Sequence, residues 1–67
     1  MNPTHAPFEL RFSPLTQHGR GYSFPCDAKG LVDLDALSEQ ARNNYLFART
    51  VIGRELAWPA VRPVALH

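Results

Sequence analysis

The sequence predicts an α+β fold in which an antiparallel β-hairpin packs against one α-helix, with a short third strand possible after the helix (ββα or ββαβ). Two short stretches alternate apolar and polar residues, as half-buried strands do. A longer stretch repeats apolar residues at helical spacing, and such a helix can cover the apolar face that a lone hairpin leaves open. We expect one small domain, residues 1–67, with loose tails at 1–7 and 62–67.

The hairpin is expected to use strands at about 8–13 and 20–26. The residues expected to face inward are Phe8, Leu10 and Phe12 in the first strand and Tyr22, Phe24 and Cys26 in the second. Pro25 has no N–H to donate, so it predicts either the end of the second strand or an edge position. Gly19 lies in the long connecting loop, where it permits a positive φ.

Residues 34–51 are expected to form the helix. Asp33 suits the N-cap position, because its carboxylate can accept from the free N–H groups of the first turn. Gly53 suits the C′ position, where the chain turns left-handed. The stripe expected to face the core consists of Leu34, Leu37, Ala41, Tyr45, Ala48 and Ile52, with Val51 at its edge.

A short third strand is expected at about 54–58, since Leu56 and Trp58 recur at a spacing of two. Pro59 and Pro63 then interrupt the pattern. The apolar, proline-rich end of the chain is either an extended strap over its own domain or an arm that reaches another subunit.

The opposite face of the helix carries charged residues, namely Asp35, Glu39, Arg42 and Arg49. Leu46 lies in the middle of this face and Phe47 on its flank. Three explanations remain open: isolated surface apolar residues, which are common, a C-terminal tail that folds back over them, or a surface for a partner or a second copy.

Composition argues against several classes of function. Seven Lys and Arg balance six Asp and Glu and are interspersed with them, which argues against a strong footprint for nucleic acid or an anionic membrane, since either would need a basic stripe. One cysteine allows no internal disulfide, and neither a signal peptide nor an apolar run long enough for a membrane span is visible. We therefore expect a cytoplasmic protein.

The residues that could carry chemistry form no familiar site. Cys26 alternates with apolar neighbours, which favours a buried thiol, and the adjacent Asp27 would oppose thiolate formation. His5, His18, His67 and Cys26 match no common metal-site spacing. We expect no enzyme, no cofactor and no metal; if the loop binds an anion, His18 and Arg20 are the candidates.

Three motifs carry a resemblance: FELRF from residue 8, GRGYSFPCD from residue 19 and VDLDAL from residue 32. The stretch from residue 8 to about 58 resembles a group of short uncharacterised bacterial proteins. The resemblance implies a bacterial cytoplasmic origin. The group has no assigned activity, so it implies no functional residue.

The sequence thus predicts a small non-enzymatic protein–protein interaction module, which we expect to act as a homodimer. Its predicted contacts are Leu46, Phe47, Trp58 and Val61, because these apolar residues exceed what one helix face can bury. The alternative is a weak nucleic-acid or anion-binding accessory protein that uses Arg11, His18 and Arg20. A nucleic-acid partner is the less expected of the two.

Overall fold

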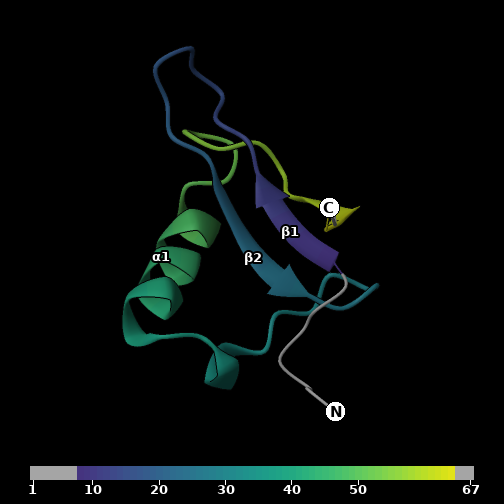
Figure 1. The fold of residues 1–67 in the computed structure, drawn as a ribbon. Helices are drawn as coiled ribbons and strands as arrows, with labels where there is room; N and C mark the ends of the chain where they lie inside the picture. Colours follow the sequence, from purple (N-terminus) through teal and green to yellow (C-terminus); the bar gives the residue numbers. More distant parts are fainter. Residues whose placement is uncertain (1–7, 65–67) are drawn as a thin grey trace.

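The computed structural model describes residues 8–64, which form a three-stranded antiparallel sheet with one α-helix against one face (Figure 1). The elements are β1 (Phe8–Phe12), β2 (Tyr22–Cys26), the 3-10 turn η1 (Leu34–Ala36), α1 (Glu39–Thr50) and β3 (Ala60–Pro63). The strand order is β2-β1-β3, so β1 is central. The predicted α+β fold is confirmed, in its ββαβ form.

The hairpin forms as the alternation predicts. β1 pairs with β2 from Phe8 opposite Cys26 to Phe12 opposite Tyr22. Leu10, Phe12, Phe24 and Cys26 are buried, and Phe8 and Tyr22 pack partly buried against them. The inward faces of both strands are therefore the predicted ones.

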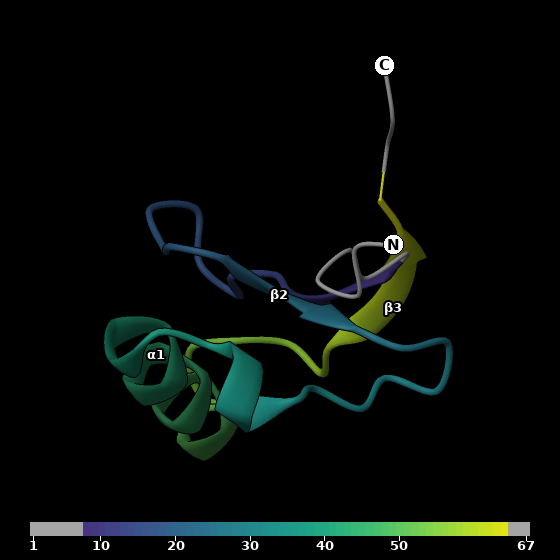
Figure 2. The same ribbon diagram turned by 60° about the horizontal axis from the view of Figure 1, so that its bottom comes forward.

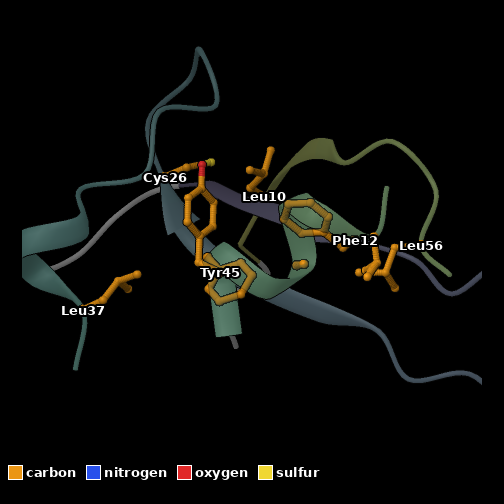
Figure 3. Packing of buried hydrophobic residues seen from close by; sticks show 9 residues of the cluster. Leu10, Phe12, Cys26, Leu37, Tyr45 and Leu56 are labelled. Atoms are coloured by element: carbon orange, nitrogen blue, oxygen red, sulfur yellow. The ribbon is translucent and has the colours of Figure 1, made fainter. Parts of the chain in front are cut away.

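An aromatic cluster joins the hairpin to the helix (Figure 3). The Tyr45 ring of α1 meets the Phe24 ring at 5.2 Å between centroids and the Phe12 ring at 6.3 Å. Phe12 and Phe24 are 5.8 Å apart, and all three contacts are edge-to-face. Aromatic pairs prefer such geometry, which adds about 0.5–1.5 kcal/mol per pair beyond burial.

The helix starts later than predicted. Leu37 has extended backbone (ψ 148°), which separates the short turn η1 from α1. Asp33 caps only η1, accepting from the Asp35 N–H at 3.1 Å. The N-cap of α1 is Ser38, whose hydroxyl accepts from the Ala41 N–H at 3.1 Å. Two capping residues follow one another in this segment, and the apolar periodicity alone does not show that the chain breaks between them.

Arg42 holds the two helical pieces together. It was expected on the solvated face beside Glu39, but its guanidinium turns toward η1. There it donates to the carbonyl oxygens of Leu34 at 3.2 Å and Leu37 at 3.5 Å. The Leu34 carbonyl opens η1 and also accepts from the Leu37 N–H at 3.2 Å, so Arg42 adds a second donor there and ties α1 to η1.

The apolar stripe faces the core on both sides of the break between η1 and α1. Of its members, Leu37, Tyr45, Ala48 and Val51 are buried, and Leu34, Ala41 and Ile52 pack partly buried against the core. α1 ends at Thr50 with Val51 as its C-cap, so Gly53 lies one residue beyond the predicted C′ position, although it has the left-handed conformation expected there, with φ +86°. The inward face of the helix is thus correctly predicted, although its start is not.

The third strand is also displaced. It begins at Ala60 rather than at residue 54, and it contains Pro63, which was expected to break the pattern. β3 is an edge strand, and an edge position tolerates a residue that cannot donate to a ladder. The prolines therefore mark an edge strand here.

A slip in register accounts for the exposed position of Trp58. Arg11 pairs with Ala60 and Pro14 with Leu56. Two residues separate these pairs on the β1 side and three on the other, which is the arrangement of a β-bulge. The extra residue inverts the expected phase, so Leu56 is 2% exposed and Trp58 is 80% exposed.

The structure places part of the C-terminal segment, which was expected to be either a strap over its own domain or an arm to another subunit. Arg62 and Pro63 were placed in a loose tail, but they belong to β3, which pairs with β1 of the same chain. Residues 60–63 are thus a strap on their own domain. The predicted tails at 1–7 and 65–67 lie outside the described residues.

Two segments pack against the inner face of the sheet. Figure 2 shows α1 beneath β2 and the loop between β2 and η1 beneath β3. In that loop, a Cβ on Gly30 would lie 3.0 Å from Val61 Cγ2 and 3.6 Å from Leu10 Cδ1. The loop therefore packs tightly where the helix does not reach, and α1 is left beside the β2 edge.

Tyr45→Ala should lower the free energy of unfolding by about 3–5 kcal/mol, because it removes a buried ring that contacts both strands of the hairpin. Urea denaturation measures this. Tyr45→Phe is the matched control: it keeps the ring and loses only the hydrogen bond from Arg49 Nη1 to the hydroxyl, 3.0 Å long. Equal losses for both variants would show that the hydroxyl, not the ring, matters.

Ser38→Ala should cost about 1 kcal/mol of stability and some helix content, because the Ala41 N–H loses its acceptor. Asp33→Ala should cost less helix content, since Asp33 caps only a three-residue turn. Far-ultraviolet circular dichroism and urea denaturation compare the two. A larger loss of helix for Asp33→Ala would support a continuous helix from residue 34.

Candidate interaction site

Among the described residues, several large apolar side chains remain exposed. They are Leu15, Leu31, Leu46, Phe47, Trp58, Val61 and Val64. All four predicted contact residues belong to this set, with exposed fractions of 49% for Leu46, 47% for Phe47, 80% for Trp58 and 39% for Val61. The covering tail that the sequence left open is not formed by residues 60–63, which lie at the other edge of the sheet.

The structure does not gather these four residues on one surface. Phe47 lies beside Tyr22 of β2, with 6.4 Å between ring centroids. Val61 lies on β3, beyond the central strand, and Trp58 lies in the bulge before β3. Leu46 is next to Phe47 in sequence but points about 100° away around the helix. Phe47 lines a hollow that none of the other three residues lines.

We call this feature the Phe47 hollow. It has a volume of about 360 Å³ and lies between the loop that joins β1 to β2, the side of α1 and the turn after α1. It is lined by Thr16, Gly19, Arg20, Tyr22, Phe47, Glu55 and Leu56. Its walls thus combine two aromatic rings, one buried Leu, one cation, one carboxylate and one hydroxyl.

The aromatic wall is extended by a cation. The Arg20 guanidinium lies 5.7 Å from the Tyr22 ring centroid, within reach of a cation–π interaction. Tyr22 meets Phe47 edge-on at an interplanar angle of 64° and lies parallel to Phe24 at 6.3 Å. Phe24 is buried in the core, so the exposed rings continue directly from the aromatic cluster.

The loop that carries Arg20 is closely packed. A Cβ on Gly19 would lie 2.7 Å from Thr16 Oγ1 and 2.8 Å from Pro14 Cβ. The positive φ expected at Gly19 is wrong, since only Gly30 and Gly53 have one in the described chain. Gly19 is needed for close approach, and its N–H donates to the Thr16 carbonyl at 3.1 Å. This close approach fixes the backbone just before Arg20, whose side chain is exposed.

His18 lies in the same loop and is exposed, but it does not line the hollow. Of the two predicted anion-binding residues, the structure therefore brings only Arg20 to the candidate site. Arg11, the third basic residue considered, lies on β1, 3.7 Å from the Glu9 carboxylate. Its side chain points to the face of the sheet opposite α1, since its strand neighbours Leu10 and Phe12 point inward.

Both edges of the sheet carry a proline. Pro25 of β2 lies opposite Glu9, and Pro63 of β3 lies opposite Phe8. A proline fits only at a pair that makes no ladder hydrogen bonds, so its nitrogen faces the open edge. Each edge thus lacks one donor that an added strand would use, which disfavours association through the edges.

Cys26 is buried, as the alternation predicts. Burial raises the pKa of its thiol above the ordinary value, and the negative charges of Asp27 and Glu9 raise it further. Within residues 8–64, no three His, Cys, Asp or Glu side chains are grouped so as to hold a metal ion. His5 and His67 lie outside the described residues.

Asp27 has a structural role. Its carboxylate accepts from the backbone N–H groups of Lys29 at 2.8 Å and Leu31 at 2.9 Å, which closes the turn after β2. The hydrogen bond from Leu31 is the main reason that the pKa of Asp27 is lowered. The ionised carboxylate thus helps to hold the loop that covers β3.

Comparison with models of known protein families gives no match, and comparison with curated proteins and with solved structures gives none either. In the part of the chain that the structure describes, no helix has both the length and the apolar character needed to cross a membrane. A function for the candidate site can therefore be inferred only from the geometry of the site itself.

The sequence indicates only part of this site. Phe47 and Arg20 were singled out, but Tyr22 was assigned entirely to the core, and it is half-buried at the edge of the core. Glu55 and Thr16 gave no signal, since nothing in their local pattern shows that the loop and the turn meet. A backbone hydrogen bond joins the loop to the turn: the Leu15 N–H donates to the Glu55 carbonyl oxygen at 2.9 Å.

Iodoacetamide should alkylate Cys26 slowly in the folded protein, because the thiolate is the reactive species and burial disfavours it. Mass spectrometry follows the modification, and the urea-unfolded chain is the control that should react fast. The raised pKa of the Cys26 thiol also sets the direction in which stability changes with pH. The free energy of unfolding should fall as pH rises above the ordinary thiol pKa, because the folded state holds the proton more tightly. Fast alkylation without denaturant would contradict the buried position.

Proposed function

We propose that this chain is a small non-enzymatic protein-interaction domain whose contact surface is the Phe47 hollow. The observation that carries the proposal is the Phe47 ring, which is 47% exposed and stands against Tyr22 on the wall of a hollow. Burying a half-exposed aromatic ring in a partner gains free energy from the apolar area removed from water.

The composition of the hollow supports a protein partner. Tyr, Phe and Arg are enriched at the centres of protein interfaces, where a few such residues supply most of the binding free energy. The hollow places Tyr22, Phe47 and Arg20 together. Leu56 connects their surface to the core, since it lines the hollow and is 2% exposed.

The helix side of the hollow is held in place, which also supports the proposal. Phe47 belongs to α1, which Tyr45 anchors to the core. Side chains that are already positioned lose less conformational entropy when a partner binds. We place this interaction in the cytoplasm, since a small secreted domain would usually carry disulfides and a single cysteine cannot form one internally.

A nucleic acid or another anion is the second candidate, and Arg20 above Tyr22 is the observation that favours it. An aromatic ring beside a guanidinium can stack a base while the cation meets a phosphate. The carboxylate of Glu55 in the same hollow works against this ligand, because it repels phosphate. We therefore rank it below a protein partner.

A photo-reactive benzoyl-phenylalanine in place of Phe47 tests the proposal in cells that express the chain. Irradiation should give adducts with protein, because the replaced ring lies in the contact surface. The matched control places the same group at Ser23, which is exposed on β2 between two residues that point to the core. Gel electrophoresis and mass spectrometry identify the adducts.

Protein adducts at position 47 and none at position 23 would support the interaction surface. Adducts that nuclease removes would favour the nucleic-acid alternative. Equal labelling at both positions, or none at either, would show that the Phe47 hollow is not a contact surface.

A further inference from the structure

We propose that the partner of the Phe47 hollow is a second copy of this chain, docked across a two-fold axis so that Arg20 of each copy meets Glu55 of the other. This inference rests on the proposed function, because it names the occupant of the same surface. It goes further in assigning the two charged residues as the pair that sets the orientation of the dimer.

The charges of the hollow are the first argument. Its lining contains one cation, Arg20, and one carboxylate, Glu55. Arg11 with Glu9 is the only ion pair within residues 8–64, so Arg20 and Glu55 do not pair within their own chain. A two-fold interface brings a surface against itself, and a surface with one charge of each sign becomes complementary to itself under that rotation.

The apolar part of the hollow is the second argument. Phe47 is half-exposed and stands on the wall, beside a space of about 360 Å³ floored by Leu56 and Tyr22. Under the same rotation, the exposed part of Phe47 from each copy faces the hollow of the other. An aromatic group at the centre with a charged pair on either side is the usual anatomy of an interface, apolar inside and polar at the rim.

The edges of the sheet make one other mode of self-association, strand pairing between copies, less favourable. The open edges of β2 and β3 each carry a proline, Pro25 and Pro63, so pairing of strands between copies lacks donors. A chain of 67 residues also buries only about 60% of its unfolded surface when it folds alone. A dimer at the Phe47 hollow adds apolar burial where the core already reaches the surface.

Charge reversal gives a test that only a reciprocal pair can pass. R20E alone and E55R alone each place like charges opposite one another twice in the dimer. Each should raise the dissociation constant by about tenfold or more, measured by sedimentation equilibrium or by light scattering over a range of concentrations. The double variant R20E/E55R should recover the dimer, because both pairs again join opposite charges.

Mixing the two single variants is the more stringent part of the charge-reversal experiment. In a heterodimer of an R20E chain with an E55R chain, both contacts join opposite charges, so an equimolar mixture should dimerise more tightly than either variant does alone. K29E is the matched control, since it changes the net charge as R20E does but lies in the exposed turn after β2. Its dimer should match the wild type, and circular dichroism checks that each variant folds.

Three results would overturn the inference: a wild-type monomer at concentrations up to about 1 mM, single variants that dimerise as the wild type does, or a mixture that stays monomeric. The proposed function fails separately, since it predicts adducts at position 47 whatever the partner is. Adducts with another protein and a monomeric wild type would keep the interaction surface and reject the second copy as its occupant.

Discussion

The contact of Tyr45 with Phe12 and Phe24 is the interaction on which the rest of this structure depends. It is the point at which the helix meets both strands of the hairpin, and each ring lies edge-to-face against the other two. A two-stranded hairpin is marginal in water, and a helix of 12 residues is marginal too. Each becomes stable by covering the other, and the three rings lie where the two meet.

The position of Tyr45 also decides which side chains are left outside. Once Tyr45 and Ala48 point to the sheet, Leu46 and Phe47 must point away from the centre of the core, because successive helical residues are about 100° apart. α1 lies beside the β2 edge, so Phe47 reaches Tyr22 there and Leu46 does not. The candidate site is thus a by-product of how the core is built, and a substitution of Phe47 changes the hollow without removing a ring of the Tyr45 cluster.

Prediction from sequence succeeds where one local pattern has one explanation. The alternation in FELRF and in YSFPC fixes the inward faces of β1 and β2, and the helical spacing fixes the inward face of α1. It fails where two local signals compete. Asp33 and Ser38 are both good caps, and only the extended backbone of Leu37 decides that the longer helix starts at the second. Of the site, Phe47 and Arg20 were found, whereas Glu55 and Thr16 were not.

The sequence by itself determined the α+β class, the faces that become buried, the left-handed turn at Gly53 and the burial of Cys26. Each follows from residue spacing or from the conformational freedom of one residue, which are local properties. Only the tertiary structure decided the position of β3, the bulge that exposes Trp58 while Leu56 is buried, and the meeting of Arg20, Phe47 and Glu55 in one hollow. These depend on which distant segments pair, and the register between Pro14 and Leu56 is set by packing across the whole sheet rather than by any pattern within a strand.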